Sequence, residues 1–361
     1  MDSGTAPAAD ARLAELLAEW GEPGFRLRQI RQWKYRKLVD GYSQMTDLPA
    51  SLRNRLESEA PFRASEVIRA ATAADGQTVK VLLALQDGQQ VESVLMRQRG
   101  PHETAERNTV CVSSQAGCKM RCSFCATGHG GWQRDLAPAE IVDQVLHFGR
   151  LLETEGRRVT HLVFMGMGEP LDNYDNVLAA VHLLNDPTLF GLGARHITIS
   201  TCGLIPQIHR LAGESVQVNL AVSLGATADD RRNELIPINR RFPIRQLLDA
   251  CEAYAGSTRR RVSYEYVLIA GVNDSPAEAV RLAALLKGRL AHVNLIPLNP
   301  VTGDPYARPD EPAVRRFEEV LRHARVPATV RYSRGVDIAA GCGQLRANAT
   351  STDARSCTTV G

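Results

Sequence analysis

The 361-residue sequence lacks the features that mark membrane and secreted proteins. No stretch approaches the roughly 18 consecutive apolar residues that a membrane-spanning helix needs, so we expect no contact with a membrane. The amino terminus shows no basic region followed by an apolar run, which argues against a secretory signal and predicts a cytoplasmic protein. A strong charge imbalance is also lacking, because the net charge is only +3. Any binding of nucleic acid must therefore depend on local basic patches.

A disulfide framework is not expected either, although the chain has eight cysteines. Cytoplasmic proteins rarely keep disulfides, and Cys118, Cys122 and Cys125 form a C-x3-C-x2-C pattern that indicates metal binding. Soft thiolates suit zinc or an iron–sulfur cluster. A structural zinc site usually takes two pairs of ligands, and the sequence has no second close pair. The pattern resembles that of the radical S-adenosylmethionine (SAM) superfamily, in which three cysteines hold a [4Fe–4S] cluster and leave one iron open.

The pattern of apolar residues divides the chain into four parts. Residues 1–75 are predicted to form an N-terminal helical accessory domain, with a helical pattern from residue 11 to about residue 70, and its basic side chains make it the candidate RNA-binding part. Residues 76–108 are predicted to form a β-hairpin around Asp87-Gly88 and a linker over Arg97–Glu106. Residues 109–345 form the core, and residues 346–361 a flexible tail.

Strand and helix patterns alternate through the core, which predicts an α/β fold with a parallel sheet, open or closed into a full or partial barrel. The predicted strands are Thr109–Ser113, His161–Met165, His196–Thr201, Val216–Leu224, Val262–Ile269, Val293–Leu298 and Ala328–Tyr332. The predicted helices include Ala137–Leu152, Tyr174–Leu184, Ile244–Tyr254, Pro276–Leu286 and Pro312–Ala324.

Unusual residues follow these strands, at the end where active sites of parallel barrels lie. They are Gly166–Glu169, Ser200, Ser223, Asn299 and Cys342. The glycines of the first group permit close approach of the backbone to a ligand, and Glu169 can accept a hydrogen bond from the ammonium group of SAM. Taken alone, this segment could be only a tight turn.

Four motifs together resemble the RlmN/Cfr family of radical SAM methyltransferases, which act on adenosine in RNA. They are residues 111–118 (CVSSQAGC), 124–128 (FCATG), 165–171 (MGMGEPL) and 337–345 (DIAAGCGQL). The resemblance extends from about Gly24 to Leu345. It implies a partial (β/α) barrel core with an N-terminal helical accessory domain and a small β-hairpin between them.

The resemblance also implies roles for individual residues. By position, Cys342 carries the methyl group, Cys111 resolves the covalent adduct and Glu92 accepts a proton. The cluster ligands are Cys118, Cys122 and Cys125, and the residues that contact SAM are Gly168, Glu169, Ser200, Ser223, Leu224, Gly225 and Asn299. Two motifs depart from the family pattern: Gly225 replaces a histidine, and Ala339 and Gly341 replace the aspartate and the second alanine of the Ile-Asp-Ala-Ala-Cys pattern.

The activity implied is methylation of C2 of adenosine in the peptidyl-transferase region of 23S rRNA and in tRNA beside the anticodon. Direct transfer from SAM to an electron-poor ring carbon is unfavourable, so two SAM molecules and an S-methylcysteine intermediate are implied. The alternative within the family is methylation of C8 in 23S rRNA. A radical SAM enzyme with a non-RNA substrate and a non-catalytic iron–sulfur protein are less favoured, since neither needs both Cys111 and Cys342.

The expected partners are 23S rRNA, tRNA and an electron donor such as flavodoxin or ferredoxin, and the expected state is a monomer. Basic side chains are the candidate phosphate contacts. They are Arg28, Arg31, Lys34, Arg36 and Lys37 in the N-terminal region, and Arg231, Arg232, Arg240, Arg241 and Arg259–Arg261 in the core.

Replacing Cys118, Cys122 or Cys125 by alanine should abolish both the cluster and the formation of 5′-deoxyadenosine, because only these three thiolates are closely spaced. Iron content and SAM cleavage after anaerobic reconstitution would measure this. A triple-alanine variant that kept its iron and cleaved SAM would show that the cluster is bound elsewhere.

Overall fold

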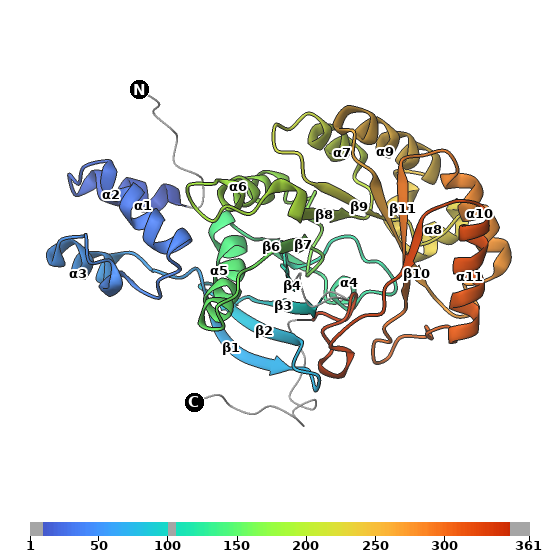
Figure 1. Cartoon of the computed structure of the whole chain (residues 1–361), viewed down its shortest axis with the longest axis horizontal. Helices are drawn as coiled ribbons and strands as arrows, with labels where there is room; N and C mark the ends of the chain where they lie inside the picture. Colours follow the sequence, from blue (N-terminus) through green and yellow to red (C-terminus); the bar gives the residue numbers. More distant parts are fainter. Residues whose placement is uncertain (1–9, 100–105, 347–361) are drawn as a thin grey trace.

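A group of N-terminal helices has a small hydrophobic core of its own in the computed structural model, which describes residues 10–99 and 106–346. Ile30, Met45 and Leu56 are fully buried within that core. The elements are α1 (Ala11–Glu19), α2 (Phe25–Arg31), a π-helical turn (Gln32–Arg36), a 3-10 turn (Tyr42–Gln44) and α3 (Ala50–Glu59). The helices lie at one end of the molecule (Figure 1).

One ten-stranded sheet carries the rest of the chain, in the order β1-β2-β3-β4-β7-β8-β9-β10-β11-β12. Strands β1 to β4 pair antiparallel, and the pairs from β4 to β12 are parallel. The bounds are β1 (Ser65–Thr72), β2 (Thr78–Leu85), β3 (Gln90–Arg99), β4 (Glu106–Cys111), β7 (His161–Phe164), β8 (Ile197–Thr201), β9 (Asn219–Ser223), β10 (Val262–Leu268), β11 (Ala291–Pro297) and β12 (Ala328–Val330). Because β1 and β12 end the order, the sheet stays open and the barrel is partial.

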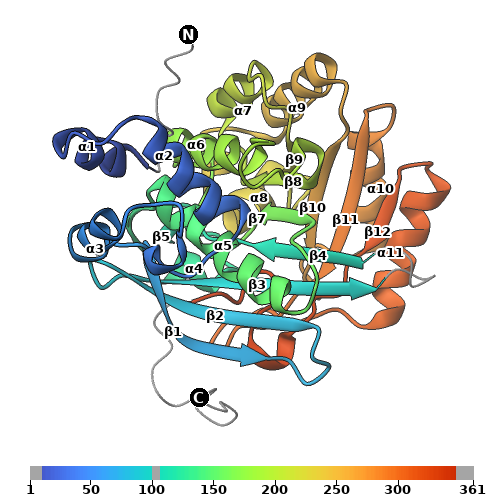
Figure 2. The same cartoon turned by 60° about the vertical axis from the view of Figure 1, so that its left-hand side comes forward.

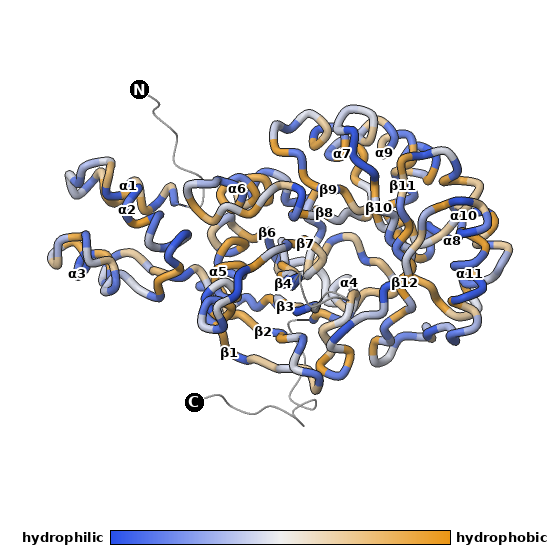
Figure 3. Tube along the Cα trace, in the orientation of Figure 1, coloured by the Kyte–Doolittle hydropathy of each residue, from blue (hydrophilic) through white to orange (hydrophobic). Residues whose placement is uncertain are grey.

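Helices cover the outer face of the curved sheet (Figure 1). They are α5 (Pro138–Thr154), α6 (Tyr174–Asn185), α7 (Ile205–Ala212), α8 (Asp229–Leu235), α9 (Ile244–Thr258), α10 (Pro276–Leu286) and α11 (Glu311–His323). Hydrophobic and hydrophilic residues alternate along several of them (Figure 3), as expected for helices with one face on a sheet and the other in water. No helix in residues 10–99 and 106–346 is long and apolar enough to cross a membrane.

The structure corrects two of the predicted boundaries. The helical pattern was expected to reach about residue 70, but Ser65–Thr72 is strand β1 and pairs with β2. A linker was expected over Arg97–Glu106, but both of its ends are strand: β3 continues to Arg99, and β4 begins at Glu106. Residues 100–105 lie outside the described part. The hairpin is therefore part of the barrel sheet, and Figure 2 shows β1 to β4 side by side. The predicted tail also lies outside the described residues beyond Arg346.

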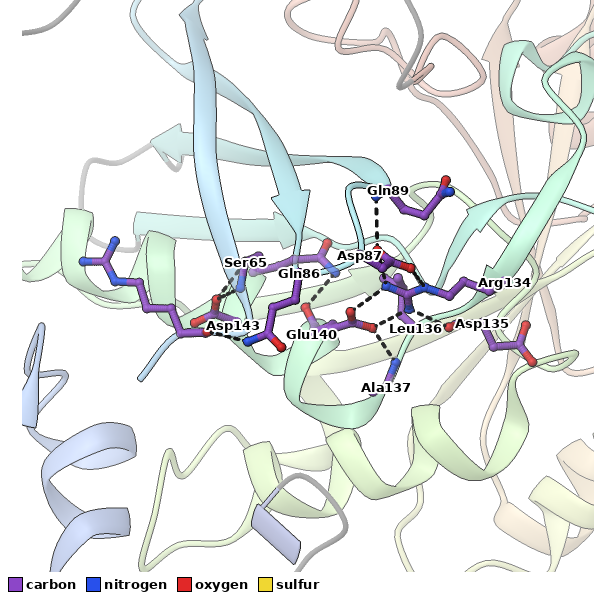
Figure 4. A network of polar contacts seen from close by, with 12 residues as sticks. Ser65, Gln86, Asp87, Gln89, Arg134, Asp135, Leu136, Ala137, Glu140 and Asp143 are labelled. Carbon is purple, nitrogen blue, oxygen red and sulfur yellow. Dashed lines mark hydrogen bonds and ion pairs between the residues drawn. The ribbon is translucent and has the colours of Figure 1, made fainter. Parts of the chain in front are cut away.

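A polar network fastens β1 and the hairpin turn to helix α5 (Figure 4). The Ser65 backbone N–H and hydroxyl donate to Asp143 over 3.0 and 2.7 Å. Arg134 donates to Asp87 in the turn over 3.0 Å and to Glu140 on α5 over 2.8 Å. The Arg134 hydrogen bond lowers the pKa of Asp87 to about 2. The hairpin is thus held in a fixed position relative to the barrel.

Candidate active site

Small polar side chains line the inner face of the barrel. Parallel registers align Ser200 with Ala221, Ala221 with Ser263, and Ser223 with Glu265. The alternate residues of these strands point outward into the core beneath the helices, as Ile199 does with no exposed area. Ser200, Ala221, Ser223 and Ser263 therefore share the inner face of three neighbouring strands.

The loop that carries the three clustered cysteines lies between two short strands, β5 (Gln115–Gly117) and β6 (Trp132–Asp135), and includes the short helix α4 (Ala126–His129). Cys118 donates its backbone N–H to Gly131 over 2.7 Å. Gly117 has φ +79°, and a Cβ there would lie 2.0 Å from the Gly131 carbonyl oxygen, so only glycine permits this approach.

The three cysteine thiols share one environment. Burial raises the pKa of Cys122 well above its usual value, and Cys125 and Cys118 raise it further. Burial also raises the pKa of Cys118 to about 12. Such thiols stay protonated in water at neutral pH and ionise when a metal binds. The donor set therefore fits a group that supplies positive charge.

The number of cysteines in the loop favours a cluster over a structural zinc ion. A structural zinc site takes four protein ligands, and the loop supplies three closely spaced thiols. In a [4Fe–4S] cluster each thiolate binds a different iron, so three cysteines hold the cluster and leave one iron open. The three cysteines thus fit the predicted cluster.

The glycine-containing segment after β7 packs directly against this loop. Gly168 has φ +100°, and a Cβ there would lie 2.7 Å from the Gln115 backbone nitrogen. Ser114 donates to the Met167 carbonyl over 2.8 Å, and Glu169 donates its backbone N–H to the Gln115 side chain over 2.9 Å. The segment predicted to bind SAM therefore lies beside the predicted cluster ligands.

Glu169 has a structural role that the sequence did not show. Its side chain is 4% exposed, and its two oxygens accept backbone N–H groups from Leu171 over 3.0 Å and Cys202 over 2.8 Å. Burial raises the pKa of Glu169, whereas these hydrogen bonds lower it. The carboxyl group joins the ends of β7 and β8, and only its remaining lone pairs are free for a ligand.

The other predicted SAM contacts are not equivalent. Ser200 and Ser223 are half-buried on the inner face. Leu224 is fully buried, its N–H donates to Glu265 and its carbonyl accepts from Arg232, so it offers no free polar group. Gly225 has φ +68°, and its carbonyl accepts from Asn273 over 2.8 Å.

Asn299 provides a test of whether a ligand fits. Its Nδ2 donates to the Cys342 carbonyl over 3.0 Å and to Ser333 over 2.7 Å. Its Oδ1 is buried and has no hydrogen-bond partner among the described residues. A buried acceptor without a donor is costly, and a donor group of SAM would satisfy it. Gly341 allows this packing, because a Cβ there would lie 2.8 Å from Asn299 Nδ2.

Cys342 faces the barrel interior on a segment that follows β12. The cysteine is exposed to solvent, yet enough atoms surround it that burial raises its pKa to about 11, with a further contribution from Glu265. Cys111 is buried at the end of β4. Burial raises the pKa of Cys111, and the charge of Cys342 raises it further. The two thiols therefore lie in one environment although they are far apart in the sequence.

Glu92 lies on the same face of the hairpin as Cys111. When the register of β3 and β4 is continued, Ser113 lies opposite Glu92, two residues after Cys111. The Ser113 hydroxyl donates to the Glu92 carbonyl over 2.6 Å. The carboxylate pairs with Lys80 over 2.9 Å and accepts the Arg346 N–H over 2.7 Å. Glu92 thus anchors the segment that carries Cys342 on the hairpin.

Comparisons with known proteins agree with this geometry. The model of the radical SAM superfamily matches residues 112–283, and the model of the ribosomal RNA large subunit methyltransferase N-terminal domain matches residues 8–62. A probable dual-specificity RNA methyltransferase RlmN from Moorella thermoacetica is 48% identical over 92% of this chain and 94% of its own length. A protein of the same description from Gloeobacter violaceus is 47% identical over 96% and 97%.

The chain belongs to the RlmN family of radical SAM RNA methyltransferases. A crystal structure of a radical SAM methyltransferase from Sphaerobacter thermophilus is also similar, with 51% identity, a TM-score of 0.89, and coverage of 94% of this chain and 97% of that one. The cofactors of this RlmN-family protein are those of its superfamily, a [4Fe–4S] cluster and SAM. The predicted fold, enzyme class and cofactors are thereby confirmed.

Several basic residues predicted to contact RNA have other partners in this RlmN-family protein. Arg31 pairs with Asp10 over 2.9 Å, and Lys37 lies 3.4 Å from the centre of the Trp33 ring. Arg28 is exposed in the N-terminal domain, as are Arg240, Arg241, Arg259 and Arg261 in the core.

Arg232 is a correction, because it is fully buried and cannot reach a phosphate. It donates to the carbonyls of Leu224 over 2.9 Å, Cys202 over 2.7 Å and Ser223 over 2.9 Å, and to Asn239 over 2.9 Å. Burial lowers its pKa. The side chain joins the carboxyl ends of β8 and β9, and nothing in the sequence distinguished it from the exposed Arg231 beside it.

Arg232→Met should destabilise the protein by at least about 2 kcal/mol, because the carbonyls it satisfies would stay buried without donors. Urea unfolding of the apoprotein would measure the free-energy change. Arg231→Met is the matched control, since Arg231 is exposed and, in the part of the chain that the structure describes, its one ion pair is with Glu234; its effect should stay within about 0.5 kcal/mol. Equal effects of the two changes would contradict the role of Arg232.

Proposed function

We propose that the protein methylates C2 of adenosine in 23S rRNA and in tRNA through S-methylation of Cys342. The observation that carries this proposal is that the Cys342 segment is bonded through Arg346 to Glu92 on β3, the strand that pairs with β4 at Cys111. An enzyme without a methyl-carrying cysteine needs neither thiol there. The two RNA substrates are proposed because the similar proteins are described as dual-specificity RNA methyltransferases.

The residues described above would hold the cofactors. Cys118, Cys122 and Cys125 would hold the cluster, and Gly168, Glu169, Ser200, Ser223, Gly225 and Asn299 would contact SAM. Once reduced by a donor such as flavodoxin or ferredoxin, the bound cluster would supply, with a second SAM, the radical that removes a hydrogen atom from the S-methyl group; after the resulting carbon radical has added to adenine, the cluster would accept one electron.

Cys342 accepts a methyl group from the first SAM. Its thiol loses a proton, the sulfur forms a bond to the methyl carbon, and the bond between that carbon and the sulfonium sulfur breaks. Arg331 favours the thiolate, since its positive charge lowers the pKa of Cys342 against the effects of burial and Glu265. Asn299 holds the Cys342 carbonyl, which fixes the segment during the transfer.

Glu92 and Cys111 act after the methylene carbon has joined the base. Glu92 takes the proton from C2, with its carboxylate held in place by Lys80. Cys111 then attacks the sulfur of Cys342, so that a disulfide forms as the bond from sulfur to the methylene carbon breaks, and the carbon takes a proton. A dithiol reduces the disulfide before the next turnover.

Cys111→Ala should stop the reaction before release and leave RNA covalently attached to Cys342. Denaturing gels of anaerobic reactions, followed by peptide mass spectrometry, would detect the adduct. Cys251→Ala is the control, because Cys251 is fully buried in the outer core and should not trap RNA. Free methylated RNA at the normal rate from the Cys111 variant would remove its proposed role.

The product should be 2-methyladenosine. C2 is favoured over C8 because Glu169-Pro170 and the segment Leu295–Pro300 resemble the C2 branch of the family, and because the similar proteins are described as RlmN. Chromatography of digested 23S rRNA and tRNA against 2-methyl- and 8-methyladenosine standards tests this. A dominant 8-methyladenosine peak would overturn the C2 assignment.

A further inference from the structure

Glu265 is a buried carboxyl group inside the barrel to which none of the roles above applies. It lies on β10, where the register aligns it with Ser223 on β9 and Asn294 on β11. Only 7% of the residue is exposed, and among the described residues its carboxyl has one hydrogen-bond partner, Asn294, and no ion pair. A buried carboxyl without a countercharge is costly, and such groups concentrate at functional sites.

A chain of hydrogen bonds fixes which oxygen of Glu265 can carry a proton. Arg331 Nε donates to Asn294 Oδ1 over 2.6 Å, and Asn294 Nδ2 donates to Glu265 Oε1 over 2.6 Å. A guanidinium group can only donate, so the oxygen of Asn294 must face Arg331 and its NH₂ must face Glu265. Oε1 is therefore an acceptor, and a proton on the carboxyl group must reside on Oε2.

Oε2 opens into the barrel interior. It accepts no hydrogen bond within the described part of the chain, yet it is not among the buried polar atoms shielded from solvent there. Ser223 and Asn294 flank Glu265 in the sheet register, and Arg331 bonds to Asn294. Burial raises the pKa of Glu265, and Asn294 and Arg331 offset part of that effect. Because the carboxyl group is buried and its one described hydrogen-bond partner is a neutral amide, its surroundings favour the protonated form, which presents an O–H donor.

This donor lies beside the cysteine that meets the substrate. Asn294, the partner of Glu265, lies on β11, and Asn299 just after this strand donates to the Cys342 carbonyl over 3.0 Å, so both residues lie at the same rim of the barrel. When C2 of adenine bonds to carbon on Cys342, the ring nitrogens N1 and N3 flank the reacting atom. N1 is an acceptor on the Watson–Crick edge, which is free in a base turned out of its stack, whereas N3 is crowded by the ribose.

We propose that Glu265 selects adenine by donating a hydrogen bond from Oε2 to N1 of the target base. This inference rests on the proposed function, because it requires C2 of the base to face Cys342. Guanine carries a hydrogen on N1 and an amino group on C2, so it would oppose a donor with a donor and block the reacting carbon. The arrangement thus explains both base identity and the position of C2.

The experiment compares two RNA fragments that contain the mapped target, one with adenosine and one with 1-deazaadenosine, in which a C–H group replaces N1. Wild-type protein, Glu265→Ala and Glu265→Gln are assayed for kcat/KM on both. The wild type should discriminate between the fragments at least about tenfold more than Glu265→Ala, because the alanine variant has no donor to lose. Glu265→Gln should keep the wild-type discrimination, since its N–H replaces the O–H while its carbonyl still accepts from Asn294.

Ser263→Ala is the control, because Ser263 also lies on the inner face of β10 and should leave the discrimination unchanged. Equal discrimination by the wild type and Glu265→Ala would overturn the proposal, and so would loss of discrimination in Glu265→Gln. If the alanine variant does not fold, Glu265→Leu takes its place, since leucine fills a similar volume without a donor and should lose the discrimination in the same way. Formation of 8-methyladenosine by the wild type would instead refute the proposed function, and it is measured without any variant.

Discussion

The hydrogen-bonded register of the parallel strands is the constraint on which the site depends. It brings the carboxyl ends of β4, β7, β8, β9, β10 and β11 to one rim of the open barrel. Glu169 and Arg232 hold that rim together, since each satisfies backbone groups from two strand ends inside the protein. Both residues have ionisable side chains that are buried, and their burial is tolerated because nearly every polar atom of theirs has a hydrogen-bond partner.

The hairpin strands have a second purpose besides extending the sheet. The segment after β12 returns across the open side of the barrel and is seated on them: Lys80 donates to the Ala339 carbonyl over 3.2 Å, and Glu92 accepts from Arg346. Its other side is held by α4, where Thr127 donates to the Leu345 carbonyl over 2.7 Å. Cys342 is therefore fixed between the hairpin and the cysteine loop, although it is in an irregular segment.

Part of the fold and site could be predicted because the signals are local. The alternation of strands and helices predicted seven parallel strands, and the spacing of Cys118, Cys122 and Cys125 predicted the cluster loop. The strand Ser65–Thr72 was missed because its pairing partner lies in the following hairpin, and a local pattern does not report pairing. Glu265 had a visible signal, a carboxyl in an otherwise mostly apolar strand, but its partners Asn294 and Arg331 become neighbours only in the sheet.

The sequence by itself determined which functional groups are available to this protein, because the kinds of side chain and their spacing along the chain are the same in any fold. Only the tertiary structure decided which of them act together. Burial separates Arg232, which holds two strand ends, from Arg231, which faces water, although the two are adjacent and identical in kind. The fold also brings together Cys111 and Cys342, which are separated by more than half of the sequence, since the parallel strands and the returning segment meet at the same rim.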